Sequence, residues 1–308
     1  MAVVDCGTNS IRLLVADVPE SGTGALTDLT RRMEIVRLGE GVDRTGRLAA
    51  GAIARTRVAL AEYAGEIRRL GADRVRMVAT SATRDAANAD EFAAMVLDTL
   101  AVAPEVVSGD EEARLSYAGA VRGLPAGAPP PYLVVDIGGG STELVAGDGR
   151  VEAARSVDIG CVRITERHLW GDPPDPEQVA AAEADITAAL GPALAAVAGR
   201  RPATMIGLAG SVTTVAGIAL GLPAYDPARI HHARIGYEEV AKVTADLLAM
   251  PRARRLALPV MHPGRADVIG AGALILRVVM ALAGTGSVLA SEHDILDGVA
   301  WSFVDQPR

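Results

Sequence analysis

Two segments of the sequence combine carboxylates with a run of glycine, hydroxyl and amide residues that could bind phosphate. The first runs from Asp5 to Ser10 and the second from Asp136 to Glu143. Glycine in a tight turn lets the backbone approach an anion closely, and the neighbouring N–H groups and hydroxyls donate hydrogen bonds to it. An ordinary hairpin turn explains the first loop equally well, but the second is richer in glycine than a hairpin needs. The expected phosphate contacts are Asp5, Gly7, Thr8, Asn9 and Ser10 in the first loop and Gly138, Gly139, Gly140, Ser141 and Thr142 in the second.

The carboxylates of these loops are candidate metal ligands. Asp136 and Glu143 supply two oxygen ligands of the kind that Mg²⁺ prefers. Asp5 ends the strand before the first loop and could hold a metal ion or a water molecule bound to one. The sequence therefore predicts a divalent cation beside the loops, with Mg²⁺ as the first choice and Mn²⁺ as the alternative.

A cluster of acids follows a predicted strand and opens a helix. The segment Ser108–Leu115 contains Asp110, Glu111 and Glu112 in succession. Acids in a first turn suit the positive end of the helix dipole, and that explains most such clusters. One of them aimed at a phosphate would be a good general base for water. The spacing alone does not choose among the three.

Two other places offer groups for an oxyanion. Arg84 stands near the start of a helix, where its guanidinium could bind an oxyanion through two N–H groups. A surface salt bridge with Asp85 or Asp90 is the alternative. A third glycine segment, Gly207–Thr214, could contact phosphate or a nucleotide through Gly210 and Ser211. Close packing of a strand on a helix explains that segment equally well.

An internal repeat indicates which elements position these residues. Val3–Leu13 aligns with Val134–Leu144 at a constant offset of 131, and over the fifteen positions from Val3 to Asp17 seven residue types are identical. Each copy is a buried strand that ends in Asp, a polar turn that contains glycine, and a second apolar strand. Two halves built on one plan, each alternating strands with helices, predict an α/β fold.

The repeat also suggests domain boundaries. We place the first half at residues 1–122 and the second at 123–294, with a C-terminal helix within 295–308 that could cross back and complete the first half. The segment 123–131 is rich in proline and short, so we expect the two halves to face each other across a cleft.

Periodicity and capping signals predict the remaining elements. Asp175, Pro176 and Gln178 combine a helix N-cap, a first-turn proline and a capping-box partner, so a long alanine-rich helix should start there. A further helix should lie between Gly236 and Pro251. The other expected elements are strands at 11–18, 74–79, 105–107 and 143–146 and helices at 53–70 and 92–100.

Composition excludes several classes of protein. The chain has 308 residues, of which 50% are apolar, and a net charge of −8, which excludes intrinsic disorder. Its two cysteines, Cys6 and Cys161, cannot form a disulfide scaffold and are expected to be reduced, as in the cytoplasm. The acidic pI of about 5.2 argues against nucleic-acid binding. We expect no signal peptide, and no membrane span, because the apolar stretches 205–221 and 268–283 are interrupted by polar residues.

The paired loops resemble those of the acetate kinase, sugar kinase, Hsp70 and actin superfamily, and within it the chain resembles the Ppx/GppA family of exopolyphosphatases and guanosine pentaphosphate phosphohydrolases. The resemblance runs almost from end to end and implies two ribonuclease H-like domains with an active site in the cleft between them. The segments that carry it are 5–12, 79–88, 108–115, 136–143, 160–163, 207–214 and 265–269.

The same resemblance implies roles for individual residues. Glu112 matches the family's catalytic base, and Asp136 and Glu143 match positions associated with the divalent metal. Arg12 and Arg84 match positions associated with polyphosphate or guanosine tetraphosphate. The looser candidate for the same task is Arg265.

The resulting expectation is a Mg²⁺-dependent exopolyphosphatase that releases orthophosphate from short polyphosphate and forms a homodimer. Larger members carry C-terminal extensions that this sequence lacks after Arg308, which favours short substrates. One alternative is hydrolysis of guanosine pentaphosphate, a nucleotide of the stringent response, and another is a non-catalytic sensor of guanosine tetraphosphate. An ATP-dependent kinase fits less well. The sequence also departs from many relatives at Asp297, where they carry Arg-Glu before Gly-Val.

Overall fold

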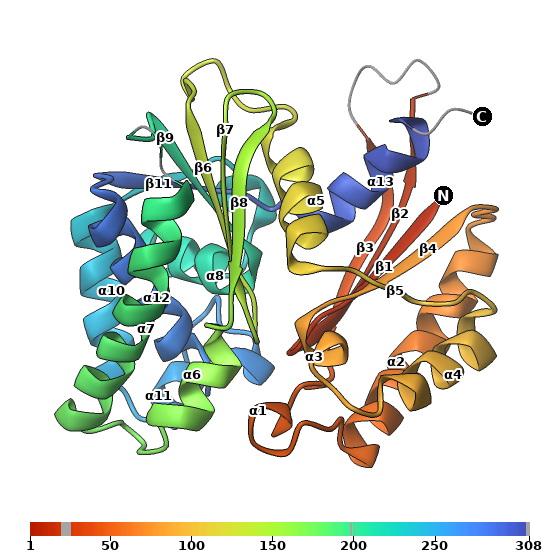
Figure 1. The fold of residues 1–308 in the computed structure, drawn as a ribbon, viewed down its shortest axis with the longest axis horizontal. Helices are drawn as coiled ribbons and strands as arrows, with labels where there is room; N and C mark the ends of the chain where they lie inside the picture. Colours follow the sequence, from red (N-terminus) through yellow and green to blue (C-terminus); the bar gives the residue numbers. More distant parts are fainter. Residues whose placement is uncertain (20–25, 198, 200, 306–308) are drawn as a thin grey trace. The chain divides into compact units, whose positions relative to one another are not determined.

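The computed structural model describes residues 1–19, 26–197, 199 and 201–305 and divides the chain into two compact units (Figure 1). Unit 1 contains residues 1–123 together with the C-terminal segment that begins at Ile295, and unit 2 contains residues 124–294. The end of the expected C-terminal segment, residues 306–308, lies outside the described residues.

Unit 1 is built on a five-stranded sheet in the order β3-β2-β1-β4-β5. The first three strands pair antiparallel, and β4 and β5 continue the sheet parallel to β1. The strands are β1 (Ala2–Cys6), β2 (Ser10–Asp17), β3 (Thr27–Ile35), β4 (Val75–Ala79) and β5 (Glu105–Val106). The helices are α1 (Val42–Thr45), α2 (Ala50–Arg69), α3 (Ser81–Arg84), α4 (Ala89–Leu100), α5 (Gly109–Val121) and α13 (Ile295–Asp305).

Alternating side chains of β1 build a separate core on each face of this sheet. Val4 belongs to the cluster that includes Leu60 and Tyr63 of α2, whereas Val3 belongs to the cluster that includes Val299 of α13. Successive residues of a strand point to opposite faces, which explains why neighbours join different cores. Helices α5 and α13 lie side by side in unit 1, as the yellow and dark blue ribbons show (Figure 1). The C-terminal helix is therefore an integral part of unit 1.

Unit 2 repeats the strand plan of unit 1. Its six strands run in the order β10-β11-β9-β6-β7-β8, in which β6, β7 and β8 pair antiparallel and β9 and β11 are parallel to β6. Read from β8 to β11, this is the order of β3 to β5 in unit 1, so the repeat in the sequence is a repeat of topology. The strands are β6 (Tyr132–Ile137), β7 (Thr142–Gly147), β8 (Val151–Val157), β9 (Thr204–Leu208), β10 (Arg234–Gly236) and β11 (Ser287–Ala290).

The helices of unit 2 share one core with the sheet. Helix α12 is buried along most of its length, and α7 and α10 pack against it (Figure 1). The helices are α6 (Cys161–His168), α7 (Pro176–Val197), α8 (Ala209–Ala219), α9 (Pro227–Ile230), α10 (Tyr237–Ala249), α11 (Arg252–Leu256) and α12 (Ile269–Ala283), with a 3₁₀ turn at Pro263–Arg265.

The start of α7 confirms one half of the predicted capping box. Asp175 Oδ1 accepts a hydrogen bond from the backbone N of Gln178 at 2.8 Å, as an N-cap should. The other half is wrong, because Gln178 Oε1 accepts from the backbone N of Gly171 at 3.0 Å and its amide donates to Asp175 Oδ2. The glutamine therefore secures the preceding loop.

Helix α7 is also long and apolar enough to cross a membrane by length and composition alone, which the sequence reading overlooked. A single helix that passes this test is weak support for a span. Ala182, Ile186, Leu190 and Leu194 recur at intervals of four residues and pack into the core of unit 2. That stripe is the buried face of an amphipathic helix that packs on the core of unit 2.

The structure explains the aspartate at position 297. Asp297 is 2% exposed and binds the guanidinium of Arg31 through two bonds, Nη2–Oδ1 at 2.7 Å and Nη1–Oδ2 at 3.1 Å. Arg31 Nε donates in addition to Asp28 at 2.9 Å. The pair therefore fastens the edge strand β3 to α13.

We expect Asp297→Asn to lower the free energy of unfolding by about 2–4 kcal/mol, because the largely buried guanidinium of Arg31 loses its main counter-charge. Urea denaturation of the full chain measures the change. The control is Glu40→Gln, which removes an exposed ion pair with Arg55 and should cost less than about 1 kcal/mol. Equal midpoint shifts for the two variants would show that the buried pair contributes no more than a surface pair.

Candidate functional site

The first loop connects β1 to β2, and its backbone is hydrogen-bonded to residues 36–39. The backbone N of Gly7 donates to the carbonyl of Ser10 at 2.9 Å, which closes the turn. The carbonyls of Thr8 and Asn9 accept from backbone N–H groups within residues 36–39 at 2.8–3.1 Å. The loop thus has a defined backbone, with its carbonyls turned toward residues 36–39.

Asp5 and Arg12 form an ion pair across the first hairpin. They lie directly opposite each other in the β1–β2 register, and both Nε and Nη2 of Arg12 donate to Asp5 Oδ2, at 3.0 and 2.5 Å. The carboxylate therefore already has a guanidinium beside it. This arrangement favours a structural partnership with Arg12 over metal binding, and the metal role of Asp5 stays a prediction.

The structure distinguishes the three acids at the start of α5. The hydroxyl of Ser108 caps the helix by accepting from the backbone N of Glu111 at 3.2 Å. At the positions that they take on α5, Asp110 and Glu111 are exposed, whereas Glu112 is buried. Glu112 Oε2 accepts from Nη1 of Arg84 at 3.1 Å. Two of the predicted site residues are thus in direct contact.

Arg84 is positioned by a backbone carbonyl as well as by the carboxylate of Glu112. Its Nη1 also donates to the carbonyl of Val107 at 3.0 Å, so one nitrogen bridges the strand end and the buried carboxylate. The sequence left Asp85 and Asp90 as alternative partners for this arginine, and the ion pair that the structure forms is with Glu112. Such an ion pair also occurs where the role is purely structural, so the catalytic roles of Arg84 and Glu112 stay predictions.

The second loop follows the same plan as the first but carries different charges. The backbone N of Gly138 donates to the carbonyl of Ser141 at 3.0 Å, which reproduces the closure of the first loop. Asp136 and Glu143 lie directly opposite each other in the β6–β7 register and are both buried. The position of Arg12 in the first copy is therefore occupied by a second carboxylate in this one.

This pair of carboxylates fits a divalent cation. Like charges directly opposite each other on neighbouring strands are unfavourable, and a shared cation removes the repulsion. The side chain of Ser156 on β8 donates to Glu143 Oε1 at 2.7 Å and orients that carboxylate. Mg²⁺ commonly uses one or two protein carboxylates and completes its shell with water and substrate phosphate. Among the described residues no group of three or more acidic, histidine or cysteine side chains has metal-binding geometry, so this pair would hold such an ion with non-protein ligands.

The third glycine segment is a direct junction between a strand and a helix, and its contact with phosphate stays a prediction. Gly207 and Leu208 end β9, and α8 begins at Ala209, whose φ is 66°. A Cβ on Gly210 would lie 2.1 Å from Cζ of Arg265, so a larger residue there would require this flexible guanidinium to move. Arg265 Nη1 donates to the carbonyl of Gly210 at 3.3 Å. The glycine is thus explained by close packing of an arginine.

Ser211 links this segment to the helix that follows the second loop. Burial raises the pKa of the Cys161 thiol at the start of α6, although a hydrogen bond with Ser211 and the charge of Arg265 act in the opposite direction. This raised pKa gives no support for a role of Cys161 as a nucleophile. The structure brings Ser211 and Arg265 together beside α6.

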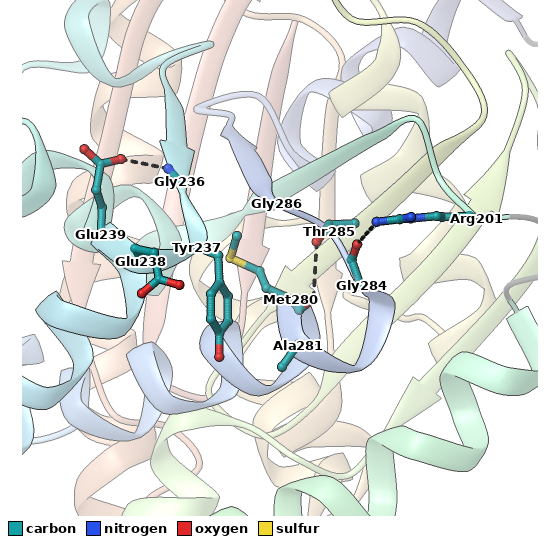
Figure 2. Close-up of a pocket in the computed structure, with 10 residues that line it drawn as sticks. All are labelled: Arg201, Gly236, Tyr237, Glu238, Glu239, Met280, Ala281, Gly284, Thr285 and Gly286. Atoms are coloured by element: carbon teal, nitrogen blue, oxygen red, sulfur yellow. Dashed lines mark hydrogen bonds between the residues drawn. The ribbon is translucent and has the colours of Figure 1, made fainter.

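A hollow in unit 2 lies away from these residues. It has a volume of about 600 Å³ and is lined by Arg201, Tyr237 and Glu238 among others (Figure 2). The hollow adjoins the first residues of β11, whereas the glycine segments follow the last residues of β6 and β9. Because these strands are parallel, the hollow and the glycine segments lie at opposite ends of the strands. None of the predicted site residues lines it.

Sequence reasoning missed two residues that organise the second loop. Ser156 orients Glu143, but only the pairing of β8 with β7 shows it. Arg163 donates from Nε to the carbonyl of Gly140 at 2.8 Å. Arg163 lies in one of the segments that carry the family resemblance, which was the one available signal for it.

Comparison with known proteins covers nearly the whole chain. The Ppx/GppA phosphatase family matches residues 15–306. Exopolyphosphatase 2 of Mycobacterium tuberculosis is 50% identical over 313 residues, which cover 98% of each chain. The crystal structure of an exopolyphosphatase-like protein superposes with a TM-score of 0.94 and 41% identity over 99% of this chain and 98% of that one. An Aquifex aeolicus member of the Ppx/GppA family gives a TM-score of 0.81 and 31% identity over 98% and 96%. These structures confirm the expected two-unit α/β fold of the actin-like superfamily.

Proposed function

The chain belongs to the Ppx/GppA phosphatase family, and we propose that it is an exopolyphosphatase that hydrolyses the terminal phosphoanhydride bond of inorganic polyphosphate and releases orthophosphate. The observation that carries the proposal is the contact between the buried carboxylate of Glu112 and the guanidinium of Arg84. A base for water and a cation for phosphate oxygens are the two groups that this hydrolysis needs from side chains.

Glu112 accepts a proton from the attacking water in this proposal, and Arg84 binds an oxygen of the substrate. The two hydrogen bonds described for Arg84 both use Nη1. A guanidinium carries donors on two further nitrogens, so it can bind a phosphate oxygen without leaving the carboxylate. Arg84 would then hold the substrate beside the base. Positioning and electrostatics supply most of the rate enhancement in phosphoryl transfer.

The second loop binds the terminal phosphate through backbone N–H groups, with Mg²⁺ at Asp136 and Glu143 and Mn²⁺ as the alternative ion. When bound, such a cation neutralises charge on the phosphate oxygens. The two carboxylates hold it, and Ser156 keeps Glu143 in place. Arg12 and Arg265 are further candidates for the phosphates along the chain. The expectation that groups from both units act on one substrate stays a prediction.

An assay of orthophosphate release tests the proposed function. We expect the wild-type protein to release phosphate from short polyphosphates with Mg²⁺ and without any acceptor, and to stop when a chelator removes the ion. A higher rate with guanosine pentaphosphate would favour the alternative substrate. Tight binding of guanosine tetraphosphate without turnover of any substrate would favour the sensor, and acceptor-dependent ATP consumption would favour a kinase.

We also place the protein in the cytoplasm and expect a homodimer. Cys6 and Cys161 are both buried and free, as suits a reducing compartment. Light scattering on the purified chain measures the oligomeric state.

A further inference from the structure

The carbonyl groups of the second loop point toward the start of α6. Backbone N–H groups of residues 161–163 donate to the carbonyls of Gly138 and Gly139 at 2.9–3.2 Å. The carbonyl of Gly140 accepts from the side chain of Arg163, whose Nε lies 2.8 Å away. The first N–H groups of a helix have no partner within it, so the loop also caps α6.

This arrangement fixes the direction of the loop's own N–H groups. A trans peptide is planar, and its N–H points opposite to its C=O. The three peptides whose carbonyls face α6 carry the N–H groups of Gly139, Gly140 and Ser141, which therefore point away from the helix. Within the described part of the chain these three N–H groups have no hydrogen-bond acceptor. Successive N–H groups aimed the same way form a site for an anion.

Gly160 allows α6 to approach the loop this closely. A Cβ at this position would lie 2.3 Å from the carbonyl oxygen of Gly139 and 2.5 Å from the backbone N of Gly140. These are backbone atoms, so any larger residue would push the loop itself. The helix and the loop are therefore in close backbone contact at this glycine.

We propose that Arg163 is a positioning residue for the phosphate loop, and this inference rests on the proposed function. Its guanidinium holds the peptide between Gly140 and Ser141 and so aims the Ser141 N–H at the substrate phosphate. The bonds from residues 161–163 that use backbone N–H groups survive any change of side chain, whereas the bond to Gly140 depends on this arginine. The side chain of Arg163 is 11% exposed, and its Nη2 lies 3.9 Å from Oδ1 of Asp158.

The first loop shows why this bond matters at the second. Asn9 corresponds to Gly140 in the repeat, and its carbonyl accepts from the backbone N–H groups of Val36 and Arg37 at 3.1 and 2.9 Å. The equivalent peptide is thus held there by backbone alone. In the second loop the side chain of Arg163 holds the equivalent peptide. A substitution of this residue can therefore disturb the loop without moving the strands.

Steady-state kinetics of Arg163→Ala with short polyphosphate tests the inference. We expect kcat to fall about 10- to 100-fold with KM within about threefold, because a misdirected donor weakens transition-state stabilisation more than binding. Arg163→Lys should lose nearly as much, since an ammonium group does not reproduce the Nε donor. Added guanidinium should restore part of the Arg163→Ala rate. The matched control is Arg167→Ala, one turn further along α6, where the ion pair is with Asp185 and the rate should not change.

Thermal unfolding of each variant separates positioning from folding, and Arg163→Lys serves if the alanine variant does not fold. An unchanged kcat, or a rise in KM alone, would overturn the inference. If the wild-type enzyme hydrolyses no polyphosphate, the proposed function fails independently, and calorimetry with inorganic phosphate decides on Arg163. A Kd for phosphate about two- to threefold higher for Arg163→Ala than for wild type, within the limit expected for KM, would then support the positioning role, and an equal Kd would overturn it.

Discussion

Replacing Glu112 by Gln is expected to reduce orthophosphate release from polyphosphate by about 10²–10⁴-fold, the usual contribution of a general base. The amide keeps the size of the side chain and can still contact Arg84, whose Nη1 lies 3.1 Å from Glu112 Oε2. It cannot take a proton from water. We therefore expect kcat to fall while KM for polyphosphate changes little, as measured by phosphate release over a range of polyphosphate concentrations.

The neighbouring acid provides the control for this experiment. Glu111 precedes Glu112 in the same first turn but is exposed, so Glu111→Gln removes an equal charge from the helix N-terminus without touching the buried site. Its rate should stay within about twofold of wild type, because surface substitutions rarely perturb a site. If Glu112→Gln also keeps nearly the wild-type rate, another group acts as the base and the assignment is wrong.

Removing a charge from the carboxylate pair should have the next largest effect. Asp136→Asn leaves Glu143 as the remaining anionic ligand on these two strands. We expect kcat to fall about 10²–10³-fold and the Mg²⁺ concentration for half-maximal rate to rise at least about tenfold, because charge neutralisation by a metal contributes several kcal/mol. A Mg²⁺ titration of the rate measures both.

Thermal unfolding tests metal binding by Asp136 and Glu143 without any measurement of activity. In chelator, Asp136→Asn should melt above wild type, because it removes repulsion between facing carboxylates. In Mg²⁺ the order should reverse, since an ion that binds only the folded protein stabilises it by mass action. Asp148→Asn is the control, because that residue is exposed beyond the end of β7. A melting temperature of wild type that does not respond to Mg²⁺ would show that the pair is not a metal site.

Local patterns carried much of the fold prediction. The two hairpins were predicted because strand alternation and a glycine turn are encoded within about ten residues, and the structure has them at β1–β2 and β6–β7. The N-cap at Asp175 is equally local and was confirmed. The edge strand β3 was missed, because Arg31, Arg32 and other charged residues hide its alternation. Its charges are satisfied by distant partners, including Asp297 and Glu66.

The sequence by itself determined the repeated α/β plan, the family resemblance and the identity of the acids and glycines from which a site could be built. Those features depend on residue type and near-neighbour spacing. Tertiary structure alone decided which partner each side chain meets: Arg12 beside Asp5, Glu143 beside Asp136, Arg84 on Glu112 and Arg163 on Gly140. Strand register and helix packing determine these contacts. Contacts between residues far apart along the chain depend on how whole elements dock, and a short stretch of sequence does not specify that.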